Sequence, residues 1–310
     1  MRILVYLERS GVRGGIEVFA ERHVARLRAE GHEVEVTDDP ADDFDEIIVH
    51  KCSDVATLEK FPPEKTTYYV HDHEPICPRT YAYTPLKHNC TRRSGVWPCI
   101  LCAPLCRSWK AALGRVFAQG RRKRAMARFK RIVVISEFMK SRLAANGLPK
   151  EKIVVEPPVM DSGDAGDSRK SSSSSLSCDL LYVGQLIRGK GVQLLLAAMA
   201  RMKKLRTLDI VGTGNMEPKL KAIAANLGLG ERVRFNGFQR DPKEWMLAAR
   251  CVVVPSFWQE PYGLVAAEAV ALGRKVVAFA IGGLPEACQG KATLVPPGDV
   301  AALAKALEEA

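Results

Sequence analysis

Residues Val252–Ala287 have the sequence VVVPSFWQEPYGLVAAEAVALGRKVVAFAIGGLPEA, in which the alternation of strand and helix is clearest. It begins with a short β-branched run that Pro255 ends, and it continues with an apolar helical pattern that Pro261 opens and Gly273 stops. A second apolar strand follows from Lys275 to Phe279. The stretch therefore predicts two strands joined by a helix, which is the repeating unit of an α/β sheet.

Two carboxylates in this stretch are candidates for one ligand site. Pro261 places Glu260 at the mouth of the predicted helix, and Glu268 lies about two turns further along roughly the same face. Gly282 and Gly283 then allow the backbone to approach whatever occupies the crevice. This arrangement suits a polyhydroxylated ligand that carries phosphate.

The same alternation of strands and helices fills the rest of the chain, whose 310 residues are enough for two domains. The segment from Met160 to Ser177 has few large apolar side chains and contains the run Ser171–Ser175, which is typical of a linker. We expect an N-terminal domain at 1–160, a linker at 161–178 and a C-terminal domain at 179–310. The expected strands are 2–7, 34–37, 47–50, 67–71, 132–135, 153–156, 180–183, 208–211, 232–235, 251–254 and 275–279, and the expected helices are 16–29, 137–145, 192–204, 216–227, 242–249 and 261–272.

Small residues follow the predicted strands of the second half. Because parallel strands end at one edge of a sheet, these residues are expected to line a single cleft. They are Gly184, Gly212, Gly214, Gly237, Ser256, Gly282 and Gly298. In the first of these loops, GQLIRGKG, Arg188 and Lys190 are flanked by glycines and are candidates for holding a diphosphate, although such side chains also commonly face solvent.

The N-terminal half offers two candidate positions. A glycine-rich loop ending in Gly14 and Gly15 separates the first strand from its helix, and it either brings backbone N–H groups to an anion or is only a tight turn. His71 ends a predicted strand in YYVHDHEPICPR, where open α/β sheets bind their ligands. A lone histidine has a structural role as its alternative.

Nine cysteines, an odd number, and the acidic Glu8 close to the N-terminus favour reduced thiols in a cytoplasmic protein. No apolar run reaches the roughly 18 residues that a membrane-spanning helix needs. Four cysteines that include a Cys-x2-Cys step are either simple thiols or a structural zinc clip that holds an insertion. They are Cys90, Cys99, Cys102 and Cys106.

The basic charge is concentrated in one segment. Arg107–Arg131 holds ten Lys and Arg residues and no acidic one, so that of the net charge of +11 only +1 remains elsewhere (11 − 10). Such a segment favours an anionic membrane surface or a nucleic acid, or it is a solvated face. An apolar stripe from Trp109 to Phe117 is expected to end at Gly120, and beyond Phe117 only Phe129 is available to stack on bases, which disfavours nucleic acid.

The motifs together resemble those of the retaining GT-B glycosyltransferases, specifically glycosyltransferase family 4, also called glycosyl transferases group 1. EPYGLVAAE is similar to the family's paired glutamate motif, and YVGQLIRGKG is similar to its phosphate loop. VGTGNMEPKLK and AIGGLPE resemble two further signatures, and GVRGGIE, YYVHDHEPICPR and VVISEFMKSRL match more loosely. The resemblance implies an α/β GT-B fold, with two Rossmann-like parallel-sheet domains that face a cleft.

The resemblance also implies an activity. It implies a hexosyltransferase-type, retaining and metal-independent enzyme, without a cofactor, that moves a sugar from a nucleotide sugar to a glycan or lipid-linked acceptor. Polysaccharide or cell-envelope synthesis at the cytoplasmic membrane face is the expected setting, with Arg107–Arg131 on anionic lipid as a peripheral contact and no nucleic-acid partner.

The implied roles fall on particular residues. Glu260 would lie beside the donor sugar hydroxyls, Glu268 would hold the ribose and Lys190 would bind the phosphates. His71 would face the transferred sugar, so that Glu260, His71 and Lys190 form the implied catalytic set. The implied donor-binding residues are Gly14, Gly15, Gly184, Arg188, Lys190, Gly212, Gly214, Glu260, Gly263, Leu264 and Glu268.

Two departures from the family pattern stand out. Gln185 occupies a position where the family has arginine, and we expect Arg188 to supply the missing charge. The chain ends at Ala310, in a predicted helix after Asp299, where relatives continue into a helix that crosses back onto the N-terminal domain; a fragment or a loose hinge is therefore expected. The alternatives are a nucleotide-sugar epimerase of similar architecture, which the family signatures disfavour, and a nucleic-acid-binding protein that uses the basic and Cys-rich region.

Overall fold

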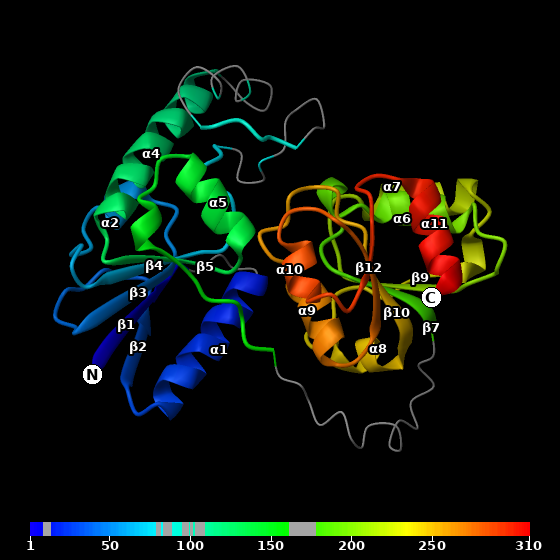
Figure 1. The fold of residues 1–310 in the computed structure, drawn as a ribbon, viewed down its shortest axis with the longest axis horizontal. Coiled ribbons are helices and arrows are strands. Elements are labelled where there is room, and N and C mark those ends of the chain that lie inside the picture. Colours follow the sequence, from blue (N-terminus) through cyan, green and yellow to red (C-terminus); the bar gives the residue numbers. More distant parts are fainter. Residues whose placement is uncertain are drawn as a thin grey trace. The chain divides into compact units, whose positions relative to one another are not determined.

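The computed structural model describes residues 1–8, 14–78, 82, 89–94, 99, 102, 109–160 and 178–310, with the backbone alone over 109–112. The chain divides into two compact units, Met1–Pro158 and Val159–Ala310. Each unit is built on a six-stranded sheet whose strand pairs are all parallel, with helices packed on it (Figure 1). The predicted pair of parallel α/β sheets is confirmed. The predicted linker falls almost entirely on residues 161–177, outside the described residues.

The sheet of the first unit has the strand order β2-β1-β3-β4-β5-β6. Alternate residues of its strands face opposite sides, so Leu4 and Ile47 pack with α4 and α5, while Ile3 and Ile48 pack with α1. The strands are β1 Arg2–Leu7, β2 Glu33–Thr37, β3 Glu46–Lys51, β4 Thr66–Val70, β5 Arg131–Val134 and β6 Ile153–Val155; the helices are α1 Gly15–Ala29, α2 Val55–Leu58, α4 Trp109–Arg128 and α5 Glu137–Ala145, with a 3₁₀ turn η2 Lys150–Lys152.

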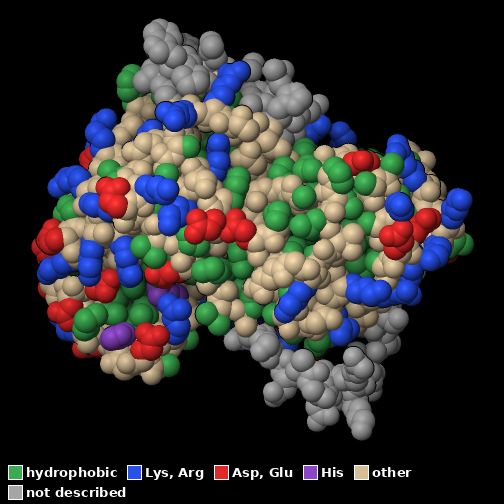
Figure 2. Space-filling view, viewed as in Figure 1, with side chains coloured by type: hydrophobic (Ala, Val, Ile, Leu, Met, Phe, Trp, Pro, Cys, Tyr) green, Lys and Arg blue, Asp and Glu red, His purple; other side chains and the backbone are tan. Residues whose placement is uncertain are grey.

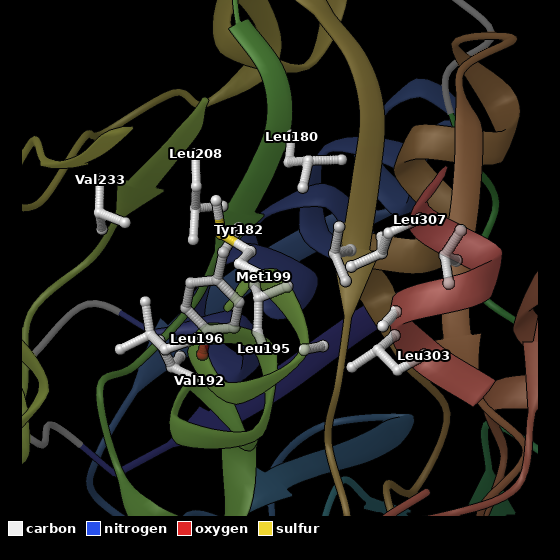
Figure 3. Packing of buried hydrophobic residues seen from close by; sticks show 14 of the residues in the cluster. Leu180, Tyr182, Val192, Leu195, Leu196, Met199, Leu208, Val233, Leu303 and Leu307 are labelled. Atoms are coloured by element: carbon white, nitrogen blue, oxygen red, sulfur yellow. The ribbon is translucent and has the colours of Figure 1, made fainter. Parts of the chain in front are cut away.

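The sheet of the second unit has the order β12-β11-β10-β7-β8-β9. One core cluster includes Leu195 and Met199 of α6, which lie beside Tyr182 of β7, and also Leu303 and Leu307 of α11 (Figure 3). The strands are β7 Cys178–Val183, β8 Leu208–Val211, β9 Val233–Phe235, β10 Ala249–Val254, β11 Lys275–Phe279 and β12 Thr293–Val295; the helices are α6 Val192–Met199, α7 Glu217–Asn226, α8 Lys243–Ala248, α9 Leu264–Ala271, α10 Leu284–Cys288 and α11 Val300–Glu309, with 3₁₀ turns η3 Arg188–Lys190 and η4 Gly230–Arg232.

Three predicted helix boundaries were wrong. Helix α4 runs unbroken through Gly120, because a glycine inside a helix costs only about 1 kcal/mol and buried side chains such as Met126 hold the helix on the sheet. Helix α6 ends at Met199 rather than at residue 204. Helix α9 begins at Leu264 rather than at Pro261, since Gly263 has a φ of +117° that no helix accommodates. No helix in the described part of the chain is both long and apolar enough to cross a membrane.

Candidate functional site

The loops after β7 and β10 meet at the carboxylate of Glu260. Its Oε1 atom accepts hydrogen bonds from Nζ of Lys190 at 2.6 Å, Oγ of Ser256 at 2.6 Å and Nε1 of Trp258 at 2.8 Å. Glu260 is only 6% exposed, whereas the side chain of Lys190 is 25% exposed. Two of the predicted catalytic residues, Glu260 and Lys190, are therefore brought together as an ion pair that faces partly outward.

This carboxylate is held in its charged form. Burial alone raises the pKa of Glu260, but the charge of Lys190 and the hydrogen bonds from Lys190, Ser256 and Trp258 outweigh burial and leave the pKa below its usual value. The Lys190 ammonium also lies 5.2 Å from the centre of the Trp258 ring. All three donors reach the same oxygen, so the second oxygen, Oε2, receives none of these bonds.

Glycines let the loop after β7 pack directly against the loops after β8 and β10. A Cβ atom on Gly191, whose φ is +78°, would lie 1.8 Å from the carbonyl oxygen of Pro255, and one on Gly214 would lie 2.4 Å from that of Leu186. The N–H of Phe257 donates to the carbonyl of Gly189 at 3.1 Å. Because backbone packs directly on backbone here, Lys190 has a fixed position relative to Glu260.

Gly282 and Gly283 let the loop after β11 pack directly against the backbone of Glu260 and Pro261. A Cβ on Gly282 would lie 2.3 Å from the carbonyl oxygen of Glu260, and the N–H of Gly283 donates to that oxygen at 2.8 Å. These two glycines therefore help to fix the Glu260 loop, and their approach to a ligand stays a prediction.

The remaining predicted donor residues of this unit lie in the loops after β7 and β8 and at the start of α9 and within it. Glu268 is half-buried within α9, about one turn after Leu264 begins that helix. Glu260 lies in the loop before α9 rather than at its first turn, so the two carboxylates are not on one helical face as predicted. Gly184 and Gly212 follow β7 and β8, as expected.

Two side chains of the loop after β7 are exposed. Gln185 and Arg188 both face solvent, and the carbonyl of Gln185 accepts a hydrogen bond from the Tyr182 hydroxyl at 2.9 Å. The substitution of Arg188 for the missing arginine stays a prediction.

In the first unit, His71 follows β4 and lies at the end of a row of three histidines. Nε2 of His71 is 3.0 Å from Nδ1 of His50 in β3, and Nε2 of His50 is 3.1 Å from Nδ1 of His23 in α1. Phe19 and Tyr69 enclose the row: Phe19 meets the His71 ring edge-on at 5.0 Å, and Tyr69 lies 4.8 Å from the His50 ring. The sequence pointed to His71 alone.

All three rings of this row are neutral at physiological pH. Burial lowers the pKa of His23 to about 4, with help from Arg26 and Arg131, and it lowers the pKa of His71 to about 3. Burial and the two neighbouring rings hold the pKa of His50 well below its usual value. These histidines therefore act as hydrogen-bonding groups rather than as charges.

The glycine loop of the first unit is described only from Gly14 onward. The N–H of Gly14 donates to the Glu17 carboxylate at 2.9 Å, which caps the start of α1. That N–H is thus already engaged, while the exposed Gly15 begins the helix. The approach of Gly14 and Gly15 to a donor stays a prediction.

Three of the four cysteines predicted as a zinc clip line one cavity. Cys90, Cys99 and Cys102 share it with Cys77, and Arg92, Arg93 and Arg142 complete part of its wall. Among the described residues no group of three His, Cys, Asp or Glu side chains is arranged to hold a metal ion, and Cys106 lies outside them. The zinc clip stays a prediction.

The basic segment is not one uniform charged face. Arg122 is buried, pairs with Glu74 at 2.9 Å and donates to the carbonyl of Cys52 at 2.9 Å. Lys123 donates to the Ser94 hydroxyl at 3.0 Å. Phe129 is 1% exposed, so it cannot stack on bases. On the visible face of the first unit, basic and acidic side chains are interspersed (Figure 2).

Comparison with known proteins shows that the second unit is similar to one family. Residues 177–310 match the model of the family Glycosyl transferases group 1. The D-inositol 3-phosphate glycosyltransferase of Mycobacterium sp. strain KMS is 36% identical over 177 residues, which are 53% of this chain and 40% of that relative. The aligned part is therefore less than half of that relative's length.

Two solved structures share the whole fold. Sucrose-phosphate synthase from Thermosynechococcus elongatus superposes with a TM-score of 0.70 at 20% identity, covering 99% of this chain and 88% of that one. Anabaena HepE in complex with UDP-glucose superposes with a TM-score of 0.69 at 19% identity, covering 100% and 89%. The predicted GT-B fold is confirmed by these likenesses.

Proposed function

We propose that this protein is a glycosyltransferase that transfers a sugar from a nucleotide-sugar donor. The main support for the proposal is the Lys190–Glu260 pair, which lies at the carboxyl ends of the strands of the second sheet. Glycines let its loops pack closely, and this unit is similar to the Glycosyl transferases group 1 family. The carboxyl ends of the strands are where open α/β sheets bind ligands. That HepE was solved with UDP-glucose supports a nucleotide sugar as the donor class.

The geometry supports a division of labour around the donor. Lys190 is partly exposed and cationic, so it can neutralise the donor phosphates while it remains in contact with Glu260. Glu260 has one oxygen occupied by three donors, which leaves Oε2 to accept from a sugar hydroxyl. Glu268 is proposed to hold the ribose, and His71 to contact the transferred sugar.

We further propose retention of anomeric configuration without a metal. The leaving nucleoside diphosphate would be stabilised by Lys190, by Arg188 and by the backbone amides that begin α6. Stabilisation of a leaving diphosphate by fixed cations and amides is the electrostatic help that a glycosyl transfer of this type requires.

A thermal-shift panel of UDP, GDP and ADP and their sugar conjugates tests the donor class. A ligand at 100 times its dissociation constant should stabilise the protein by about 2.7 kcal/mol. Glu260→Gln should retain most nucleotide affinity and lose sugar transfer, since it keeps the shape but not the charge. If no nucleotide stabilises the protein, the proposed donor site is wrong; if Glu260→Gln transfers sugar at the parental rate, only its place beside the sugar is wrong.

We propose that the acceptor is a glycan or lipid-linked acceptor, reached by docking of α4 on an anionic membrane. Phe117 is 60% exposed and, at helical spacing, shares a face of α4 with the exposed Arg121, Arg124 and Arg128. Arg121 is paired with Glu59, so Arg124 and Arg128 carry more of the proposed lipid contact. Each cation near an anionic surface contributes about 1 kcal/mol.

Liposome co-sedimentation tests this docking. Binding should require anionic lipid, fall with added salt, and weaken in an Arg124→Glu/Arg128→Glu variant. Lys219→Glu/Lys243→Glu is a control with the same change of charge on exposed residues of the second unit. Arg122 is left unchanged because it is buried. Equal binding of both variants, or none to anionic vesicles, would remove the membrane from the proposal.

A further inference from the structure

The row of histidines next to His71 indicates how His71 could act on the substrate. That His71 contacts the substrate at all is taken from the proposed function. His23, His50 and His71 come from α1, from β3 and from the loop after β4, and their rings are joined by two N···N contacts of 3.1 and 3.0 Å. His23 and His50 are 7% and 2% exposed, so neither is placed to contact a ligand directly. They can act only through His71.

The number of N–H hydrogens allows two arrangements of the hydrogen bonds in this row. A neutral imidazole has one N–H, and each N···N contact needs one hydrogen. His50 uses both of its nitrogens and has one hydrogen to give, so it donates either to His71 or to His23. In the first arrangement His23 donates to His50, His50 donates to His71, and His71 keeps its hydrogen on Nδ1. In the second, every bond is reversed and Nδ1 of His71 is an acceptor.

Charges at both ends of the row favour the first arrangement. Arg26 and Arg131 act on His23 and oppose a positive charge there, so the His23 end of the row lies in a positive potential. Glu17 acts on His71 in the opposite sense and favours a proton on it. A positive end and a negative end orient the N–H dipoles in one direction, from His23 toward His71.

We propose that His23 and His50 are positioning residues that fix His71 in one ring plane and as the Nδ1–H tautomer, so that His71 donates a hydrogen bond to a hydroxyl of the substrate. The rings of Phe19 and Tyr69 support this role, because they pack against the row and prevent the imidazoles from rotating. A histidine oriented by a buried hydrogen-bond partner is the common way in which proteins select a tautomer.

Long-range ¹H–¹⁵N spectra of the full chain labelled at histidine test the proposal. The chain has six histidines, so each ring can be assigned by substitution. His71 is expected to have a protonated Nδ1 and a bare Nε2 at neutral pH. His23→Leu removes the first donor of the row and should shift His71 toward the mixture of tautomers seen in free histidine. His23→Asn keeps an amide donor near the position of Nδ1 and should preserve the native tautomer.

The same variants separate positioning from a merely structural role. Sugar transfer should fall about fivefold in His23→Leu, the effect of one hydrogen bond, and should stay within about twofold of the parent in His23→Asn. A protonated Nε2 on His71 in the parent protein, or an unchanged tautomer in folded His23→Leu, would overturn the proposal. The tautomer is read without substrate, so a His71→Ala variant that transfers sugar normally would refute only the proposed contact of His71 with sugar.

Discussion

The Lys190–Glu260 pair and the histidine row are both buried at least in part, but the first is charged and the second is neutral. Glu260 is buried and stays charged, because a cation and two further donors surround one of its oxygens. His50 is also buried, but its two ring nitrogens meet neutral imidazoles rather than an opposite charge, so burial removes its charge. A charged pair suits the phosphates of a donor, and a neutral row suits hydroxyl groups. The two sites should therefore respond differently to substitution and to pH.

The largest effect is expected from Glu260→Ala. It leaves Lys190 without its partner and removes the acceptor of the Ser256 and Trp258 bonds, and breaking a buried pair costs about 3–5 kcal/mol. Denaturant unfolding followed by tryptophan fluorescence measures the loss. Glu244→Ala, an exposed glutamate of α8, should leave the free energy of unfolding nearly unchanged. Equal stability of the two variants would show that the pair contributes nothing.

Gly282→Ala should be the next most damaging change. Both Gly282 and Gly273 have a φ near the left-handed region, +61° and +67°, so alanine is strained by about 1–2 kcal/mol at either position. Only at Gly282 would the added Cβ meet backbone, 2.3 Å from the Glu260 carbonyl, whereas nothing lies within 4 Å at Gly273. Gly282→Ala should therefore lose more stability than Gly273→Ala and also weaken nucleotide binding. Similar losses would mean that the Glu260 loop adapts to the extra atom.

Acid should lower the stability of the folded protein, because the histidines of the row are neutral when folded. The folded-state pKa values of His23 and His71, about 4 and about 3, lie below the ordinary value near 6.5, so the unfolded chain binds more protons between these values. Stability is therefore complete above about pH 6.5 and falls as the pH drops, by up to about 1.4 kcal/mol per pH unit for each histidine.

Replacing one histidine isolates its share of this effect. Between pH 6.5 and pH 5, His23→Asn should lose about 2 kcal/mol less stability than the parent, because asparagine has no proton to gain. His32→Asn, a residue outside the row, serves as the control and should follow the parent. Parallel curves for all three proteins would contradict the neutral row.

The smallest effect is expected from Ser256→Ala. It removes one of three donors to Oε1 of Glu260 and leaves Lys190 and Trp258 in place, so the cost should be about 1.5 kcal/mol. The pKa of Glu260 should rise but the carboxylate should stay charged at neutral pH. A loss as large as that of Glu260→Ala would show that the three donors act as one unit.

The sequence predicted individual site residues better than the contacts between them. Lys190 and Glu260 were both predicted as donor contacts, from their glycine-rich loop and paired glutamate motif, but they are 70 residues apart and their ion pair depends on how β7 and β10 lie side by side. Ser256 was predicted only as a small residue after a strand. Trp258 was not predicted, since an aromatic residue in a loop has no characteristic spacing.

The histidine row was missed for a similar reason. His23 lies within an amphipathic helix and His50 lies near the end of an apolar strand, so neither breaks a local pattern. Only strand order places His50 beside His71, because β3 and β4 are neighbours in the sheet. A helix that opens with proline was a reasonable prediction for α9, but the positive φ of Gly263 overrides it.

Calorimetric titration of UDP-glucose into the full chain tests whether the donor binds at the Lys190–Glu260 pair. If Lys190 binds the donor phosphates, Lys190→Met should weaken binding by about tenfold or more, the effect of losing a charge-assisted hydrogen bond, while Lys243→Met on exposed α8 should bind like the parent. The thermal midpoint of each variant, measured alongside, confirms that it is folded. Equal affinity of folded Lys190→Met and the parent would contradict a donor site at the Lys190–Glu260 pair.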